Sequence, residues 1–205
     1  MTRRFAMLFA LAALLLLPSA GRAQSASGTP EAVGAEECRT EPISFERLQS
    51  IAATPVAETP TPESAASPTP FAMPAGDAAD AQTTAAVTRT VREFIACLNA
   101  GDVLRTLSLY SDAYIAAAVG PRGMPQDAYA VLGRPTPAAE GDKTDLYDIG
   151  DVLILPDGRA AVLVVGDNRS SPDPAKPALF YLTRSGDRWL LDDFVETQPS
   201  ATPAP

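Results

Sequence analysis

Residues 144–196 are the part of the sequence that most restricts the fold. They read TDLYDIGDVLIL, a Pro-Asp-Gly turn, RAAVLVVGD, a proline-rich loop, PALFYLTR, a Ser-Gly-Asp turn and RWLLDDFVE. Short apolar runs separated by turn residues predict about four antiparallel strands connected as a meander. The run from Ala160 to Val165 is apolar on both faces, which predicts a central strand that is covered on both sides. Gly150 interrupts the first strand and predicts a β-bulge there.

The last strand, RWLLDDFVE, carries acidic and apolar residues together. Successive side chains of a strand point to opposite faces of the sheet. Strict alternation divides this strand into two sets, with Trp189, Leu191, Asp193 and Val195 on one face and Leu190, Asp192 and Phe194 on the other. We therefore expect one aspartate on each face, beside apolar neighbours.

A strong helical pattern precedes the strands. Its apolar residues recur at the spacing of one helical face and are Val87, Val91, Phe94, Ile95 and Leu98. This pattern predicts a long amphipathic helix that buries the stripe against the rest of the domain. Thr83 or Thr84 is suited to cap the start of the helix, and Gly101 to end it in a left-handed turn.

Three shorter helices are predicted between the long helix and the sheet. Asp102 is suited to cap one that runs through Tyr110, and Ser111 or Asp112 to cap the next. Pro125 opens the last of them. Helices followed by an antiparallel sheet define an α+β fold.

The sequence begins with the features of a secretory signal peptide. Arg3 and Arg4 precede an apolar run over residues 5–17, and small residues suited to cleavage follow at 21–23. The apolar run is shorter than the roughly 20 residues of a membrane span. We therefore expect cleavage after Ala23 and a secreted or extracytoplasmic, cell-envelope-associated location, with an uncleaved anchor as the alternative.

Residues 24–81 form a low-complexity segment rich in Thr and Pro. Repeated proline without an apolar period predicts an extended, disordered linker. A short amphipathic helix is predicted near 42–53, close to a cysteine, with Pro42 at a position that the first turn of a helix tolerates. The tail over 198–205 has the composition of the linker and is also predicted to be disordered.

The charge and the residue types exclude several functions. The formal charge is −9, and loss of the three arginines of the signal peptide would make it −12. Such an acidic chain is not suited to bind nucleic acid or, after signal cleavage, an anionic membrane surface. The chain contains no histidine, which excludes Ser-His and Cys-His nucleophile pairs and ordinary zinc sites. We expect no cofactor and no metal.

The two cysteines, Cys38 and Cys97, predict a disulfide bond. An even number of cysteines in an oxidising compartment favours pairing. The bond would close a loop of about 60 residues and so restrict the unfolded chain. Two buried free thiols are the alternative.

Two motifs resemble the nuclear-transport-factor-2-like family, also called SnoaL-like or cone-shaped. FIACLNAGDVLRTLSLYSDAY at 94–114 resembles the first helices of that family, and SGDRWLLDDFVE resembles its last strand. The resemblance covers residues 82–197 and indicates a secreted bacterial member. It implies helices packed on a strongly curved sheet, a cavity between them and a homodimer through the sheet face. The family's early β-hairpin is not visible here, because 115–143 reads as helix and loop.

Catalytic members of the family place an aspartate inside the cone, often with a histidine or a tyrosine. Here the candidates for a general base are Asp148, Asp192 and Asp193, with burial as the means of raising a carboxyl pKa. The alternative is that these aspartates lie on the solvated face. The candidates for lining a pocket are Phe94, Tyr110, Tyr114, Tyr147, Phe180, Tyr181 and Trp189.

The sequence favours a secreted, non-catalytic domain that binds a small apolar ligand or a protein partner. Two alternatives stay open. One is an Asp-dependent lyase or isomerase of the SnoaL-like type. The other is a structural envelope-associated module without a ligand, in which Phe94, Phe180 and Trp189 fill the cone.

Overall fold

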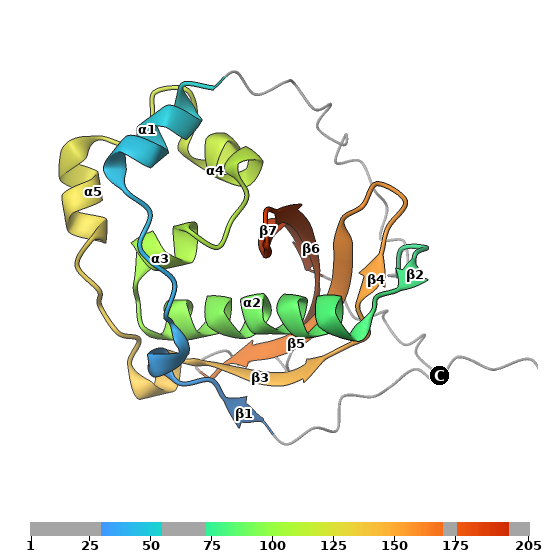
Figure 1. The fold of residues 1–205 in the computed structure, drawn as a ribbon. Helices are drawn as coiled ribbons and strands as arrows, with labels where there is room; N and C mark the ends of the chain where they lie inside the picture. The colour runs from blue at the N-terminus through green and yellow to red at the C-terminus, as the bar shows by residue number, and fades with distance from the viewer. Residues whose placement is uncertain (1–29, 55–72, 170–175, 197–205) are drawn as a thin grey trace, which may run out of the picture.

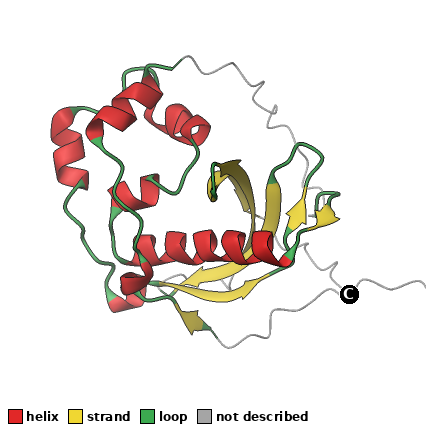
Figure 2. Ribbon diagram, viewed as in Figure 1, coloured by secondary structure: helices red, strands yellow, loops and turns green. Residues whose placement is uncertain are grey.

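The computed structural model describes residues 30–54, 73–169 and 176–196. Outside these ranges lie the predicted signal peptide 1–23, residues 55–72 of the predicted linker, residues 170–175 of the proline-rich loop and the tail 198–205. The described chain is an α+β protein whose helices pack against a strongly curled antiparallel half-barrel sheet (Figure 1, Figure 2). The predicted α+β class is confirmed.

The sheet contains more strands than the sequence predicts. Seven strands are present among the described residues, four of them long and three of two residues each. Their bounds are β1 Glu31–Ala32, β2 Asp77–Ala78, β3 Thr144–Ile149, β4 Leu153–Ile154, β5 Ala160–Asn168, β6 Lys176–Ser185 and β7 Arg188–Glu196. The four long strands are the predicted meander. β1 and β2 extend it by pairing with β3 and β4.

β5 is the central strand. It pairs with β3 and β4 along one edge and with β6 along the other, and β7 lies beyond β6. Ala160, Ala161 and Val162 at its start have 0% exposed surface. The predicted central strand covered on both sides is therefore confirmed.

Two β-bulges lie within long strands, at Tyr147 in β3 and at Asp192 in β7. The predicted interruption of the first strand at Gly150 is present, because β3 ends at Ile149 and β4 begins at Leu153. Gly150 follows β3, and its N–H donates to the carbonyl of Leu163 at 2.8 Å. Leu153 pairs with Ala161, so the register with β5 shifts by one residue between Gly150 and Leu153, as a bulge there would require.

The bulge in β7 also changes which residues share a face. Leu182 pairs with Leu191 and Tyr181 pairs with Asp193, so Asp192 is an extra residue without a partner on β6. Beyond it, Phe194 pairs with Phe180 on the concave face of the sheet. Strict alternation had placed Phe194 on the face opposite Leu191, and that prediction is wrong because the extra residue reverses the order.

Five α-helices lie among the described residues. They are α1 Phe45–Ala52, α2 Ala81–Asn99, α3 Val103–Leu107, α4 Asp112–Val119 and α5 Gln126–Leu132, and short 3-10 turns span Ala35–Glu37 and Glu140–Asp142. α2 lies along the concave side of the sheet (Figure 2). Its predicted apolar stripe is buried except for Leu98, which is 42% exposed.

Side-chain caps explain where the helices begin. Asp80, not Thr83 or Thr84, caps α2 by accepting the N–H of Thr83 at 2.7 Å. Asp102 caps α3 and Ser111 caps α4, as predicted. Gly101 has a φ of 60° and ends α2 in the predicted left-handed turn.

α3 ends earlier than predicted because the chain after it joins the sheet edge. Leu191 in β7 donates its N–H to the carbonyl of Leu109 at 2.8 Å and accepts from the N–H of Ser111 at 2.7 Å. Residues 109–111 therefore lie along the first half of β7 instead of continuing the helix to Tyr110.

The interior has a main core, a smaller core among the short helices, and a cluster of Leu155, Ala161 and Leu179 on the convex face of the sheet. The main core lies between α2 and the concave face of the sheet and includes Val87, Val91 and Leu182. The smaller core joins α1 to α3 and α4 through Leu48, Leu104 and other apolar residues. Figure 1 shows these short helices grouped at one end of α2.

Residues 30–54 form an N-terminal arm that packs against both cores. β1 extends the sheet at β3, and the arm then runs past the C-terminal half of α2 to α1 (Figure 1). The predicted disulfide between Cys38 and Cys97 is confirmed and fixes the arm to α2. The sequence predicted a short helix near 42–53, and α1 fills most of that range. The arm therefore contributes to the folded core, although the sequence had placed it in a low-complexity segment.

Candidate functional site

Two adjoining hollows lie between the C-terminal half of α2 and the concave face of the sheet, with volumes of about 270 Å³ and 180 Å³. Both are lined by Phe94, Leu98, Ala178 and Phe180. The larger hollow is also lined by Tyr110, Leu191, Phe194 and Glu196, and the smaller by Ile95, Thr144, Val164, Gly166, Asp167 and Asn168. We call the two hollows together the aromatic groove.

Aromatic rings form the floor of the groove. Phe94 contacts Tyr110 and Phe180 edge to face, with ring centroids 5.5 Å and 5.9 Å apart. Phe180 in turn contacts Phe194 at 6.2 Å. Such edge-to-face contacts stabilise aromatic clusters beyond the burial of their area. Tyr114 extends the cluster by stacking on Tyr110 at 4.2 Å.

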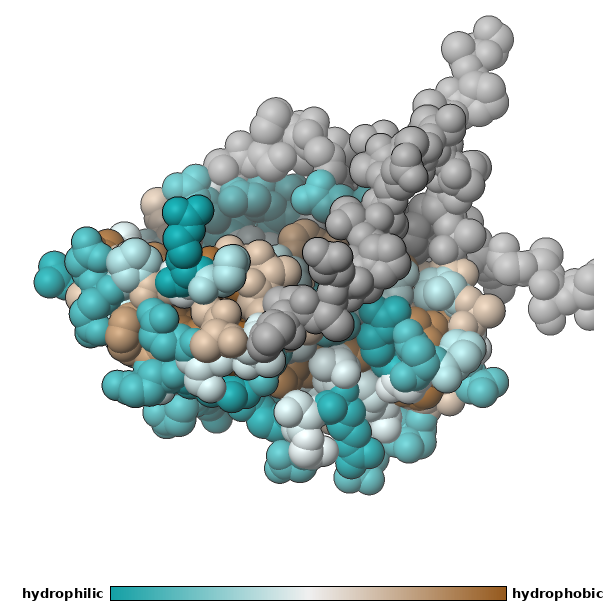
Figure 3. Space-filling view, turned by 90° about the horizontal axis from the view of Figure 1, so that it is seen from above, coloured by the Kyte–Doolittle hydropathy of each residue, from teal (hydrophilic) through white to brown (hydrophobic). Residues whose placement is uncertain are grey.

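The groove is buried at its floor and open at its rim. Phe94 and Phe180 are buried, whereas Leu98 and Phe194 are 42% and 40% exposed. Two large apolar side chains therefore face solvent at one opening. On the face shown in Figure 3, by contrast, hydrophobic surface lies in small areas between hydrophilic residues.

Tyr110 supplies a hydroxyl group at this floor. Burial raises the pKa of Tyr110 well above its usual value, and the neighbouring Tyr114 raises it further. The phenol is therefore neutral at physiological pH. It offers a hydrogen-bond donor and acceptor but no charge.

One carboxylate side chain lies on the concave face of the sheet, at the groove. Glu196 is two residues beyond Phe194 on β7 and pairs with Ala178, so regular alternation directs it to the same face. Asp167 also lines the smaller hollow, but it follows Gly166 on β5 and alternation directs its side chain to the opposite face.

The predicted pocket residues divide into two groups. Phe94, Tyr110 and Phe180 line the groove, and Tyr114 reaches it through Tyr110. The other three lie elsewhere: Trp189 is buried in the main core, Tyr147 forms the bulge of β3, and Tyr181 packs on the convex face under the guanidinium of Arg159.

Sequence reasoning did not single out Leu98, Phe194 and Glu196. Leu98 was visible as part of the apolar stripe of the long helix, but it was assigned to the core. Phe194 and Glu196 reach the groove through the bulge at Asp192. No local pattern in RWLLDDFVE marks that bulge.

The three aspartates considered as general bases do not line the groove among the described residues. Asp148 and Asp193 are exposed, and Asp193 accepts the N–H of Phe194 at 2.8 Å. Asp192 accepts the hydroxyl of Ser111 at 2.7 Å and lies 3.6 Å from the guanidinium of Arg159. The bulge and these two contacts hold Asp192 at the junction between α4 and the sheet.

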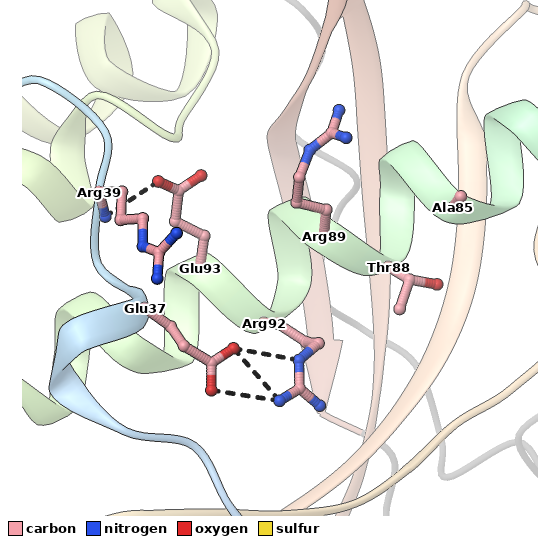
Figure 4. Close-up of a pocket in the computed structure, with 7 residues that line it drawn as sticks. All are labelled: Glu37, Arg39, Ala85, Thr88, Arg89, Arg92 and Glu93. Atoms are coloured by element: carbon pink, nitrogen blue, oxygen red, sulfur yellow. Dashed lines mark hydrogen bonds and ion pairs between the residues drawn. The ribbon is translucent and has the colours of Figure 1, made fainter.

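A larger hollow of about 570 Å³ lies along α2, where the N-terminal arm crosses it (Figure 4). It is lined by Glu37, Arg39, Ala85, Thr88, Arg89, Arg92 and Glu93. Figure 4 shows that its charges largely bind one another: Arg92 donates to Glu37 at 3.2 Å, and the backbone of Arg39 donates to Glu93 at 3.2 Å. Since these contacts fasten the arm to α2, we assign this hollow a structural role despite its size.

The described residues contain no group of three or more Cys, Asp or Glu side chains arranged to hold a metal ion. In the same residues, no helix is long and apolar enough to span a membrane. The structure thus defines an α+β protein with a curled sheet and an open aromatic groove. Comparison of the chain with protein-family models, with curated proteins and with solved structures finds no match.

Proposed function

We propose that the protein binds a small apolar ligand in the aromatic groove. The observation that carries this proposal is the exposure of Leu98 and Phe194 above a floor of buried aromatic rings. Covering apolar surface gains about 25 cal/mol for each Å² removed from water. A ligand that covers both side chains would gain this free energy without rearranging the floor.

The size of the groove restricts the ligand. The two hollows have volumes of about 270 Å³ and 180 Å³, each below the roughly 300–1,000 Å³ of pockets that hold drug-sized molecules. A short alkyl chain or a small ring system fits this space better than a large cofactor. Because the rim is open, an apolar side chain of a partner protein is the second possible occupant.

We further propose that the chain is an exported member of the nuclear-transport-factor-2-like family. The long helix α2, which lies across a curled antiparallel sheet, supports the family. The Cys38–Cys97 disulfide supports an extracytoplasmic location, because such bonds persist in oxidising compartments. The homodimer through the sheet face stays a prediction.

The two alternative functions receive less support. An Asp-dependent lyase or isomerase needs a carboxylate beside the substrate, and none of the three candidate aspartates lines the groove. A purely structural module needs a filled cone, whereas the groove between α2 and the sheet is open at Leu98 and Phe194.

The proposal is tested with the uncharged fluorophore N-phenyl-1-naphthylamine, whose emission rises in apolar surroundings. We expect saturable binding to the full chain and at least about a tenfold loss of affinity in Phe194→Ser, which removes an aromatic anchor. Val195→Ser is the matched control, because Val195 is 48% exposed on the same strand but faces the opposite side. Thermal unfolding of both variants checks that they fold.

Two outcomes would contradict the proposal. One is the absence of saturable binding to the folded wild-type chain. The other is an equal loss of affinity in the Phe194 and Val195 variants, which would place the fluorophore outside the groove.

A further inference from the structure

We infer that β7 accepts an additional strand at its outer edge, an extended segment of a partner protein that places a large apolar side chain in the aromatic groove. The inference rests on the proposed function, because the anchoring side chain occupies the same groove. It adds the backbone that carries this side chain and the atoms of β7 that would bind it.

Hydrogen bonds within the sheet show which residues of β7 bond to β6. In an antiparallel sheet the N–H and C=O of one residue point to the same neighbouring strand, and successive residues alternate. The carbonyl of Leu163 in β5 accepts the N–H of Gly150, on the side opposite to β6. Leu179 of β6, which pairs with Leu163, therefore directs its backbone groups to β7, where its partner is Val195.

Phe194 and Glu196 direct their backbone groups to the outer edge of β7. The N–H of Phe194 donates at 2.8 Å to the carboxylate of the preceding Asp193 instead of bonding to β6. Alternation gives Glu196 the same direction, so its N–H also points outward. Residues 109–111 bond to this edge only at Leu191, and no described segment continues along it. A further strand can therefore pair with β7 at these two residues.

This half of β7 is exposed on both faces of the sheet. Phe194 on the concave face is 40% exposed, and Val195 on the opposite face is 48% exposed. Soluble proteins avoid open strand edges with apolar side chains, because such edges pair with other chains. The outer strands β1 and β2 contain two residues each, and no residue of either lines the groove. The edge of β7 is therefore the one among these three outer strands that combines apolar exposure with a groove.

The edge and the groove together define the chemistry of the partner. A peptide that adds a strand to a sheet gains affinity from main-chain hydrogen bonds and specificity from pockets for alternate side chains. Side chains on the concave face of an added strand would lie next to Phe194, at the larger hollow of about 270 Å³. The partner is therefore an extended segment of strand-forming residues with a phenylalanine or leucine side chain on that face.

Two other occupants fit this edge less well. A second copy would align two strands that each carry the exposed carboxylates of Asp193 and Glu196, and like charges on facing strands repel. Four residues of strand span about 13 Å, which is short for a dimer that must bury roughly 800 Å² on each partner. The residues after β7 include Pro199, Pro203 and Pro205, which lack the N–H that a strand donates.

The test uses the uncharged peptide acetyl-Thr-Val-Thr-Phe-Thr-Val-Thr-amide, which carries its apolar side chains on one face of a strand. Displacement of N-phenyl-1-naphthylamine from the full chain measures its affinity. We expect saturable displacement, and about a tenfold weaker affinity when serine replaces the phenylalanine of the peptide.

N-methylated peptides test the backbone of the added strand. Two versions carry N-methyl groups on every second residue, in the two possible phases. Because only one edge of the added strand faces β7, one version should bind about fivefold more weakly and the other should bind as the parent peptide does.

Glu196→Pro tests the backbone of β7. It removes an N–H that points outward and leaves the bonds between β6 and β7 in place, as proline on edge strands does. The matched control is Glu196→Ala, which loses the same side chain but keeps the N–H. We expect the proline variant to bind the peptide about fivefold more weakly than the alanine variant, with equal affinities for the fluorophore. Thermal unfolding checks that both variants fold.

Hydrogen exchange of the Glu196 N–H, followed by NMR, reports on the edge directly. We expect fast exchange in the free chain and slower exchange when the parent peptide is bound. Slow exchange before the peptide is added would show that the residues after β7 or a second copy already cover the edge, and it would overturn the inference. Sedimentation would then distinguish these two occupants.

The outcomes separate this inference from the proposed function. The added strand is overturned, and the apolar groove is kept, if the fluorophore binds but the peptide does not displace it. Equal peptide affinities of Glu196→Pro and Glu196→Ala, or full binding of both N-methylated peptides, lead to the same conclusion. Failure of the fluorophore to bind the folded wild-type chain overturns the proposed function and, with it, this inference.

Discussion

The hydroxyl of Ser111 donates a hydrogen bond of 2.7 Å to the carboxylate of Asp192. The same hydroxyl accepts the N–H of Tyr114 at 3.1 Å, which makes Ser111 the N-cap of α4. Its backbone N–H donates to the carbonyl of Leu191. Three contacts of one residue thus connect the start of a helix to the bulge of β7, next to the aromatic groove.

Ser111→Ala is expected to destabilise the protein through this junction. Loss of an N-cap side chain costs about 1 kcal/mol of unfolding free energy, and loss of the hydrogen bond to Asp192 adds about 1 kcal/mol. Urea denaturation measures the change. Ser50→Ala is the control, since Ser50 is an exposed residue inside α1, and its change should stay within about 0.5 kcal/mol. A similar effect of both substitutions would contradict the role of Ser111.

The Cys38–Cys97 disulfide is expected to contribute much of the stability. It joins residues 59 apart in the sequence, and a bond that closes a loop of this length stabilises a chain by roughly 4 kcal/mol in the chain-entropy model. Urea denaturation with and without a reductant measures this contribution. The double variant Cys38→Ala/Cys97→Ala should be destabilised and insensitive to the reductant. Wild-type stability that does not change on complete reduction would contradict the expectation.

The buried phenol of Tyr110 predicts a loss of stability at alkaline pH. Its pKa in the folded protein is raised above the value of about 10 that it has in an unfolded chain. Above that pH the unfolded state loses the proton while the folded state keeps it, so the free energy of unfolding falls as pH rises. Below that pH both states are protonated and Tyr110 contributes no pH dependence.

Tyr110→Phe should therefore flatten the fall of stability at alkaline pH, measured by urea denaturation at a series of pH values. Tyr147→Phe is the control, because Tyr147 lies at the bulge of β3 outside the groove. An equal flattening of the profile in both variants would mean that the effect does not come from the phenol of the groove. An unchanged profile in Tyr110→Phe would show that other groups cause the alkaline loss.

Leu98 is expected to matter for binding more than for stability. Because Leu98 is 42% exposed, Leu98→Ser should lower the unfolding free energy by only about 1 kcal/mol. The affinity for N-phenyl-1-naphthylamine should fall severalfold, since both hollows lose a lining side chain. Val103→Ser tests the same change at a residue of α3 that is 38% exposed and outside the groove, and it should leave the affinity unchanged.

The elements with repeated local signals could be predicted from the sequence. The stripe of α2, the caps at Asp102 and Ser111 and the four long strands follow from residue type and spacing. The disulfide followed from an even number of cysteines and an expected oxidising location. Each of these signals depends on interactions within one segment or on simple chemistry.

The remaining features depend on contacts between distant segments. β1, β2 and β4 contain two residues each, which is too few to show alternation. The N-terminal arm packs through contacts such as the N–H of Ile43 on the carbonyl of Leu104, which no local pattern encodes. For the same reason, half of the groove could not be predicted. The apolar stripe of α2 assigns Leu98 to the core, and the pairing of β7 with β6 determines which face of the sheet Phe194 occupies.

The bulge at Asp192 also bears on how the length of the chain could change. Every residue of β7 except Asp192 has a partner on β6, so a chain shorter by this one residue could keep the entire pairing of the two strands. Such a deletion would leave Phe194 and Glu196 on the concave face, but the links to Ser111 and Arg159 would be lost. In the sheet, Asp192 is therefore dispensable for hydrogen-bonded register and is present as an attachment point for the neighbouring helix.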